Sequence, residues 1–442
     1  MSLVGSKFYK WKFDIEVNPL LLGIGFIVGL EVSLTMFAGS ILSNFGIAPL
    51  IGYFTDMAKD GAMVWNNPAM PLNQMDVGAI SSSYVKYIGA GMMLCGGIIG
   101  AIKLIPTIIA SIKETLKAKS STGEGEEGSS IQMILLLGGV VIGFLAAFLI
   151  SGGNIVMAII GAIISLLLSL LFVIVAGRLT GTIGTSNLPV SGMTIASLVI
   201  VTLVFVIMGW TDLEANKSLL LFGSFIVVAI AIAGGYTQSQ KVTYIIGGSK
   251  NEMQRYFTIA SIVGVIVVVG VILLLSDQLR ATGDNVQFAL PQANLMSTLT
   301  SGIMSGSLPW VMIIVGVFMA IVLYALNLPI MTIAIGFYLP IATTSIILVG
   351  ALIRLFVELV SKTEKEKEVK VSNGISLSSG LVAGGSIIGL IGIILQVTGV
   401  VTPKVPSGFA ATNSMAIALL VVLVVLTALP IILSKVKNNE QE

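Results

Sequence analysis

Histidine is absent from this chain of 442 residues, cysteine occurs once, and charged residues make up only 10% of it. Without histidine there is no zinc-metalloprotease motif and no Ser–His pair. The single cysteine, Cys95, excludes a disulfide within the chain, and its apolar surroundings indicate a small buried hydrophobe. The aspartates fall in loops or at the ends of apolar runs, and no Gly-Lys-Ser/Thr phosphate loop occurs. We therefore expect neither an enzyme nor an ATP-driven pump, and nothing indicates a cofactor or a bare metal ion.

The scarcity of charge also fixes the class of protein. A soluble domain carries about a quarter charged residues, whereas this chain is 56% hydrophobic and has a mean hydropathy of +1.04. The net charge of +2 gives no support for binding nucleic acid. The composition predicts an all-α, multi-pass membrane protein whose partner is the lipid bilayer, and we expect the cell membrane as its location.

A membrane span needs about 20 mostly apolar residues. The sequence contains about twelve such segments, with a range of 10–12, and some of them are broken or re-entrant. The block 309–360 is too long for one span, and Asn327, Pro329 and Pro340 divide it into three. We expect a first helical block with a cytoplasmic anchor at 1–112, a flexible cytoplasmic linker at 113–130 and a main bundle at 131–442.

The distribution of Lys and Arg predicts the orientation. They concentrate in both tails and in 113–119, 241–255 and 362–370, and they are scarce in 55–82, 211–217, 277–308 and 399–410. Twelve spans place the first set in the cytoplasm, together with both termini.

A weak internal repeat is also visible. Gly25-Phe26 is followed by Gly29, Ser33 and Gly39, and Gly336-Phe337 is followed at the same offsets by Pro340, Thr344 and Gly350. Related halves are common in transporters, although abundant glycine leaves chance similarity as the alternative.

The stretch from Gly177 to Ile195, GRLTGTIGTSNLPVSGMTI, stands between two long apolar runs but is rich in small polar residues. Pro189 disfavours helix at Leu188. Unwound backbone at membrane depth occurs where protein buries it or where it lines a cavity, and a helix N-terminus there attracts anions. The alternative is a kink that neighbouring Ser and Thr satisfy. The candidate substrate-binding residues of this stretch are Ser186, Asn187, Pro189, Ser191, Gly192 and Thr194.

Glu31 lies near the middle of the expected first span, with Thr35 one turn later. A carboxylate at that depth costs about 2.5–3.5 kcal/mol on insertion scales, so it should face protein or water. Glu31 is the candidate proton-coupling residue, and a carboxyl hydrogen-bonded between helices is the alternative. Its repeat-related neighbour Thr344 is a further substrate-binding candidate.

Three other charged residues lie in apolar runs. Lys103, before Pro106, is a candidate for neutralising a substrate carboxylate or Glu31, and the alternative is that it snorkels to the cytoplasmic face. Glu358 follows Arg354 by one helical turn, and this spacing is typical of an ordinary surface pair.

Several stretches resemble the oligopeptide transporter family, which includes the yellow-stripe-like metal-chelate carriers. They occur in the family's order, and the most similar is GTSNLPVSGMTI at 184–195, which resembles that family's Asn-x-Pro-Val-Ser-Gly-Met-Thr signature. The others are NPLLLGIGFIVGLEVSLTMFAGSIL from Asn18, YIGAGMMLCGGIIGAIKLIPTI from Tyr87, LNLPIMTIAIGFYLPIATTSIILVGALI from Leu326 and SSGLVAGGSIIGL from Ser378.

The resemblance implies secondary active, proton-coupled uptake of small peptides, peptide derivatives or metal chelates. Two departures accompany it. Family members generally carry a further block of spans before the region that matches Asn18, and the loop Gln240–Gln254 matches the family only at Thr243, Gly248 and Gln254. The alternative is therefore a non-autonomous membrane subunit, either a scaffold or half of a two-chain carrier. A second chain or a homo-oligomer is left open as a partner.

Overall fold

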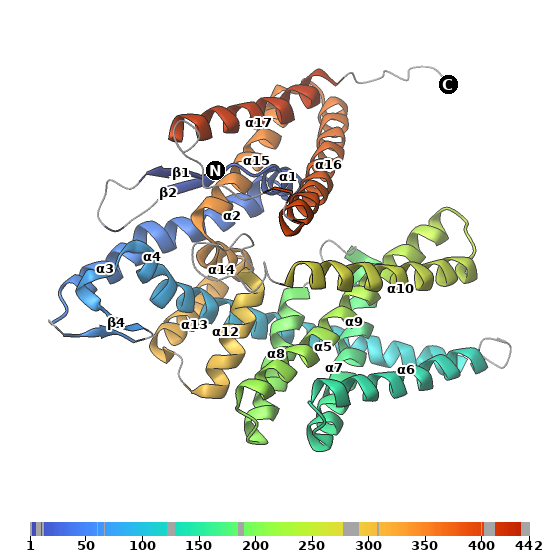
Figure 1. Cartoon of the computed structure of the whole chain (residues 1–442). Coiled ribbons are helices and arrows are strands. Elements are labelled where there is room, and N and C mark those ends of the chain that lie inside the picture. The colour runs from blue at the N-terminus through green and yellow to red at the C-terminus, as the bar shows by residue number, and fades with distance from the viewer. Residues whose placement is uncertain are drawn as a thin grey trace, which may run out of the picture. The chain divides into compact units, whose positions relative to one another are not determined.

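The computed structural model describes residues 2–5, 10, 13–59, 61–65, 67–121, 129–183, 190–276, 291–306, 309–398, 400–401 and 412–434. The chain divides into two compact units, and the division falls inside helix α5 (Lys86–Ser121). Unit 1 comprises Met1–Met93, Leu274–Ala281 and Pro309–Glu442, and unit 2 comprises Leu94–Leu273 and Thr282–Leu308. Figure 1 shows the elements of both units.

Unit 1 contains the broken helices. Its main helices are α1 (Pro19–Val28), α2 (Leu30–Ile41), α3 (Ala48–Asp56), α13 (Trp310–Ala325), α14 (Ile330–Tyr338), α15 (Ile341–Val360), α16 (Glu364–Val397) and α17 (Asn413–Leu433). Its short elements are β1 (Ser2–Gly5), β2 (Phe13–Glu16), β3 (Met63–Val64), β4 (Asn67–Pro71), the π-helical η1 (Leu42–Ile47), the 3₁₀-helical η2 (Leu72–Gln74), α4 (Val77–Ile80) and the π-helical η3 (Ser81–Val85). The strands form two short antiparallel hairpins, β1–β2 and β3–β4.

Unit 2 is built on long helices. They are α6 (Ser129–Ile150), α7 (Ile155–Ile183), α8 (Val190–Ile207), α9 (Leu213–Ile245), α10 (Lys250–Leu274) and α12 (Pro291–Ser305). Buried apolar side chains of α7, α8 and α9 form its core, where Phe205 stacks edge-on against Trp210 and Phe222.

The class predicted from composition, an all-α polytopic membrane protein, is confirmed. Within the described residues seven helical runs are long and apolar enough to cross a bilayer: Leu30–Asp56, Ile155–Gly181, Leu213–Ile245, Lys250–Leu274, Ile341–Val360, Glu364–Gly392 and Asn413–Leu433. Four shorter apolar helices accompany them, at Pro19–Val28, Leu137–Ile150, Gly192–Ile207 and Trp310–Ala325. The total of about twelve spans stays a prediction.

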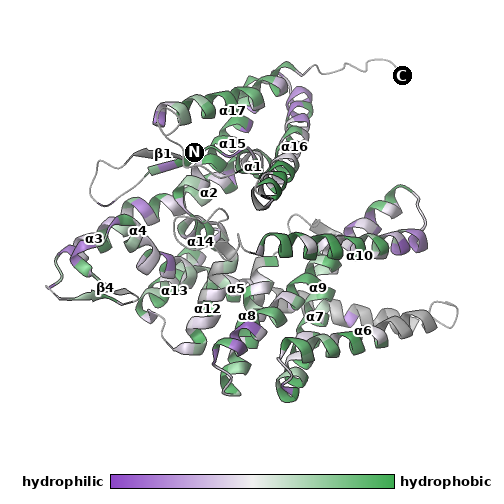
Figure 2. Cartoon of the chain, in the orientation of Figure 1, coloured by the Kyte–Doolittle hydropathy of each residue, from purple (hydrophilic) through white to green (hydrophobic). Residues whose placement is uncertain are grey.

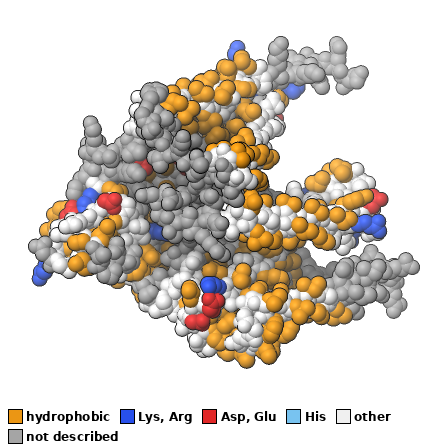
Figure 3. All heavy atoms as spheres, viewed as in Figure 1, with side chains coloured by type: hydrophobic (Ala, Val, Ile, Leu, Met, Phe, Trp, Pro, Cys, Tyr) orange, Lys and Arg blue, Asp and Glu red, His pale blue; other side chains and the backbone are white. Residues whose placement is uncertain are grey.

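The surface has the character that lipid requires. Figure 2 shows hydrophobic residues along α7, α9 and α10, with hydrophilic ones at helix ends such as the start of α10. On the face drawn in Figure 3, hydrophobic side chains dominate and charged ones gather in a few places. Because lipid solvates apolar side chains, such exposure is expected of membrane helices.

The internal repeat takes a definite form in unit 1. Two helices are each interrupted near their middle: α1 and α2 meet at Gly29, and α14 and α15 meet at Leu339 and Pro340. The block 309–360 forms three helices, α13, α14 and α15, as its Asn and Pro residues predict. The nine residues of α14 are too few for a span of their own, so the division into three spans is not confirmed. The first half of each broken helix packs on the second half of the other, α1 on α15 and α14 on α2.

Four glycines bring these helices together backbone to backbone, since a Cβ at any of them would overlap a carbonyl oxygen. The pairs are Gly25 with Ile347, Gly350 with Leu22, Gly336 with Met36, and Gly39 with Ile333. The spacing from Gly25 to Gly336 (336 − 25 = 311) equals that from Met36 to Ile347 (347 − 36 = 311). The same offset relates the remaining two pairs. The contacts are therefore reciprocal, as in a pair of repeats related by a two-fold axis.

Three segments expected as linker or loop are helical at least in part. Helix α5 continues through Ser121 into the expected linker 113–130, of which 122–128 lie outside the described residues. Helix α9 continues to Ile245, into the segment 241–255 that the charge distribution placed in the cytoplasm. Helix α16 begins at Glu364 and contains most of the expected loop 362–370. Ion pairs at helical spacing, Glu364–Lys367 (3.9 Å) and Glu366–Lys370 (2.7 Å), explain the last case, because alternating charges also stabilise a helix.

One contact conflicts with the orientation predicted from charge. Lys10 forms an ion pair with Asp56 at the end of α3, and a Cβ at Gly52 would also meet the Lys10 side chain. These residues must share one side of the membrane, whereas the Lys and Arg distribution placed the N-terminal tail and the segment 55–82 on opposite sides. The side of the membrane on which each segment lies stays a prediction.

Candidate functional site: a charged helix break

The break between α1 and α2 depends on Gly29. Its backbone angles, φ +88° and ψ 176°, are rarely adopted by residues with a Cβ. The Gly29 N–H donates to the Gly25 carbonyl (3.1 Å), and the Gly29 carbonyl accepts from the Ser33 N–H (3.2 Å). The chain thus ends one helix and starts another at a single residue. This break interrupts the expected first span, near the middle of which the sequence placed Glu31.

Arg354 of α15 closes the open end of α1. Its Nη1 donates to the carbonyls of Phe26 (3.3 Å) and Ile27 (3.1 Å), and its Nε donates to Glu358 Oε1 (2.9 Å). The last carbonyls of a helix have no partner within the helix, so the guanidinium satisfies groups that the break exposes. The predicted Arg354–Glu358 pair is present, but both side chains are partly buried and belong to the break. The interpretation as an ordinary surface pair is wrong.

A pocket of about 270 Å³ opens at this break. It is lined by Val28, Gly29, Leu30, Glu31, Val32, Arg354, Leu355 and Glu358. Two carboxylates and one guanidinium therefore share the pocket, which carries one excess negative charge when all three ionise. The charged side chains come from two different elements, α2 and α15.

Glu31 occupies a position that the sequence did not predict. It is the second residue of α2 rather than the middle of a span, and its side chain is exposed on the protein. The first turn of a helix favours a carboxylate, because unpaired N–H groups and the helix dipole lie there. Thr35 hydrogen-bonds to the Glu31 backbone carbonyl (2.7 Å), not to its carboxylate. The break thus presents Glu31 to the pocket as a free carboxylate.

The other break, at Leu339 and Pro340, is closed by hydroxyls. Ser40 of α2 donates to the Gly336 carbonyl, and Thr344 donates to Ser40 Oγ (2.8 Å) and lies 3.2 Å from the Ile341 carbonyl. Thr344 is fully buried. In this conformation the candidate substrate residue Thr344 contacts protein, and it could reach a substrate only if α15 and α2 separated.

The stretch Gly177–Ile195 is described at its edges. Helix α7 ends at Ile183 and α8 begins at Val190, as a break before Pro189 predicts. Ser186, Asn187 and Pro189 lie outside the described residues, and only the backbone of Ser191 is described. Gly192 is buried, and a Cβ there would lie 3.9 Å from the Gly97 carbonyl of α5. Thr194 donates to the Val190 carbonyl (2.8 Å).

Lys103 lies in α5, three residues before Pro106, and its side chain is exposed. It belongs to unit 2, whereas Glu31 and Thr344 belong to unit 1. The sequence candidates therefore lie in two different units, with Glu31 and Thr344 in unit 1 and the others in unit 2.

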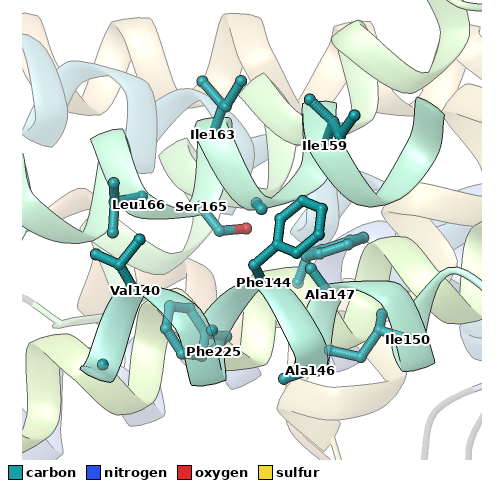
Figure 4. A pocket seen from close by; sticks show the side chains of 14 residues that line it. Val140, Phe144, Ala146, Ala147, Ile150, Ile159, Ile163, Ser165, Leu166 and Phe225 are labelled. Atoms are coloured by element: carbon teal, nitrogen blue, oxygen red, sulfur yellow. The ribbon is translucent and has the colours of Figure 1, made fainter. Parts of the chain in front are cut away.

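Two pockets of unit 2 differ sharply from the charged break. One, of about 280 Å³ between α6, α7 and α9, is apolar except for the hydroxyl of Ser165 (Figure 4). The other, of about 560 Å³, lies beside Gly177, where the unusual stretch begins, and includes Tyr236 and Thr237. Neither contains a charged side chain. A third pocket of unit 2, of about 440 Å³, includes Asp212, Glu214 and Lys217, and Glu214 pairs there with Lys217.

Sequence reasoning missed the roles of Gly29 and Arg354. Gly29 is one of 49 glycines, so its residue type carried little information. Arg354 offered a usable signal, since it stands in an apolar run directly after the second copy of the repeat.

Interrupted helices packed reciprocally, with charged groups at the interruption, are characteristic of secondary transporters. Residues 1–396 match the family described as OPT oligopeptide transporter protein, and the chain belongs to that family. It is also similar to a Haemophilus influenzae protein named "Putative oligopeptide transporter", with 24% identity over 420 residues. The match covers 84% of this chain and 64% of that protein.

Proposed function

We propose that the chain is a secondary active transporter that takes up small peptides, peptide-like molecules or metal chelates, coupled to protons, by alternating access. The observation that supports this most is the pocket at the Gly29 break, where Glu31, Glu358 and Arg354 meet inside a membrane protein of the oligopeptide transporter family. Broken helices expose backbone polar groups at membrane depth, and transporters bind substrates and coupling ions at such places.

Glu31 is the proposed proton-coupling residue. A proton on its carboxylate removes the excess negative charge of the pocket. The charged groups that line the pocket with it are Arg354 and Glu358 of α15, which are engaged with each other at 2.9 Å. Glu31 has no such counter-ion among the described residues. Of the two carboxylates in the pocket, Glu31 is therefore the one without an ion-pair partner within the described structure.

The proposed substrate contacts are those that the sequence indicated. In unit 2 they are Lys103 and the residues of the interrupted segment after α7, namely Ser186, Asn187, Pro189, Ser191, Gly192 and Thr194. In unit 1 the proposed contact is Thr344. We further propose the cell membrane as the location of the protein and the cytoplasm for both termini.

The test is uptake into proteoliposomes that contain only this purified chain. A mixed pool of short peptides and metal chelates is offered with and without an imposed inward proton gradient. Accumulation that depends on the gradient supports autonomous, proton-coupled transport. No accumulation by folded protein contradicts it and favours the second candidate, one subunit of a two-chain carrier.

The role of Glu31 has its own test. Glu31→Gln keeps the shape of the side chain but cannot release a proton at any working pH. We expect the protein to fold and the gradient-dependent part of uptake to disappear. Glu214→Gln is the matched control, because Glu214 is exposed and pairs only with Lys217 three residues later within the described structure. Proton coupling that persists in Glu31→Gln would remove Glu31 from the mechanism.

A further inference from the structure

Lys86 is a half-buried cation beside the break between α14 and α15. Its Nζ lies 5.5 Å from the centre of the ring of Tyr338, the last residue of α14. Among the described residues no carboxylate pairs with Lys86, so the ring face is its one recorded partner. A cation on an aromatic face is stabilised but not neutralised. An anion remains the missing partner.

The Tyr338 hydroxyl is also without a partner. It is buried and makes no hydrogen bond within the described part of the chain. A buried hydroxyl that lacks a hydrogen bond is unfavourable, and native structures rarely keep one without a reason. An oxygen atom of a ligand would satisfy it.

Close packing between the start of α5 and the end of α14 positions Lys86 and Tyr338 at the break. A Cβ at Gly89 would lie 3.3 Å from Tyr338 Cα, so the start of α5 packs closely on the end of α14. The π-helical segments η1 and η3 contact each other there, and Lys86 directly follows η3. Wide π turns within helices are frequent at functional sites. Helix α15 starts after Pro340 without a side-chain cap, and its N-terminus adds positive potential.

We propose that this second break is a carboxylate-binding subsite, in which the Lys86 ammonium and the Tyr338 hydroxyl hold the anionic end of the substrate. The inference rests on the proposed transport of peptides or chelates and assigns the recognition of their carboxylate to unit 1. Arg354 is not available for this role, because Glu358 and two carbonyls already occupy its guanidinium.

The first test needs no transport. The full chain in lipid nanodiscs is treated briefly with acetic anhydride, and mass spectrometry follows acetylation of Lys86. One sample contains a pool of tripeptides with free C-terminal carboxylates, and the other contains the same pool amidated. The free acids should slow the labelling of Lys86 and leave exposed Lys217 unaffected. Equal labelling of Lys86 with both pools would overturn the proposal.

The second test uses variants in the uptake assay. Lys86→Gln should raise KM for the free-acid pool about tenfold without changing kcat, because a charge-assisted hydrogen bond is lost. Lys86→Arg should restore most of the affinity, and Tyr338→Phe should raise KM less than Lys86→Gln. An unchanged KM in Lys86→Gln would overturn the subsite. Absence of uptake by the wild-type chain would contradict the transport function, while labelling still decides the subsite.

Discussion

The two helix breaks of unit 1 have the same architecture but opposite chemistry. Position 354 corresponds to position 43 in the first copy (354 − 311 = 43), so Ser43 is the repeat equivalent of Arg354. Arg354 satisfies the carbonyls at the Gly29 break with a charge, whereas Ser40 and Thr344 satisfy the Pro340 break with hydroxyls. The two breaks thus share their backbone packing, and they differ in the side chains that satisfy the exposed carbonyls.

In this conformation the hydroxyl chain closes the second break, because Ser40 and Thr344 are buried and hydrogen-bonded to each other. A guanidinium shared between carbonyls and Glu358 leaves a pocket and a free carboxylate nearby. By our proposal, proton exchange belongs to the first break. The substrate carboxylate, by our inference, belongs to the region of Lys86 beside the second.

The largest expected effect on stability concerns the glycine contacts that the two broken helices share. Gly25→Ala and Gly336→Ala should each prevent stable folding, because the new methyl group overlaps a carbonyl of the opposite broken helix. Backbone cannot move aside as a flexible side chain can, so we expect a loss of about 3 kcal/mol or more. Thermal unfolding of detergent-solubilised protein measures it.

Gly264→Ala is the matched control, because a Cβ at that position of α10 has open space around it. It should change stability by less than about 0.5 kcal/mol. Stability of Gly25→Ala or Gly336→Ala equal to that of this control would refute the close backbone contact. It would also refute the symmetry between the α1–α15 and α14–α2 contacts.

The sequence predicted much of this architecture but not its chemistry. The offset of 311 residues was visible in paired Gly-Phe motifs, and Asn327, Pro329 and Pro340 predicted the boundaries between α13, α14 and α15. The Gly29 break was not predictable, because glycine packs inside membrane helices more often than it interrupts them. The site requires Glu31 and Arg354, more than 300 residues apart, to share a pocket, and only packing reveals such a pairing.

The next effect tests the charged break alone. Arg354→Gln should destabilise the protein by about 2–3 kcal/mol, because it leaves two carbonyls and a partly buried Glu358 without their partner. The estimate lies below that for a fully buried pair, since both side chains are about one-quarter exposed (26% each). Chemical unfolding in mixed micelles measures the change.

Ser43→Ala is the comparison for Arg354→Gln. The Ser43 hydroxyl bonds to the Ser40 carbonyl of its own helix and receives one bond from the Asn44 amide. We expect a change within about 0.5 kcal/mol. Equal losses in the two variants would show that position 354 contributes nothing special to the charged break.

The smallest effect concerns a hydroxyl that the repeat left unpaired. Ser33 is the equivalent of Thr344 (344 − 311 = 33), and Ala351 is the equivalent of Ser40 (351 − 40 = 311). Ser33 is fully buried, and its hydroxyl has no hydrogen-bond partner among the described residues. Ser40→Ala should therefore cost about 0.6–1 kcal/mol, the usual worth of such a bond in a membrane protein. Ser33→Ala should be neutral or stabilising, because it removes an unsatisfied buried hydroxyl. The free energy of unfolding of both variants is measured under the same conditions. Equal destabilisation would mean that the Ser33 hydroxyl has a partner and that the two helix breaks are more alike than their hydrogen bonds indicate.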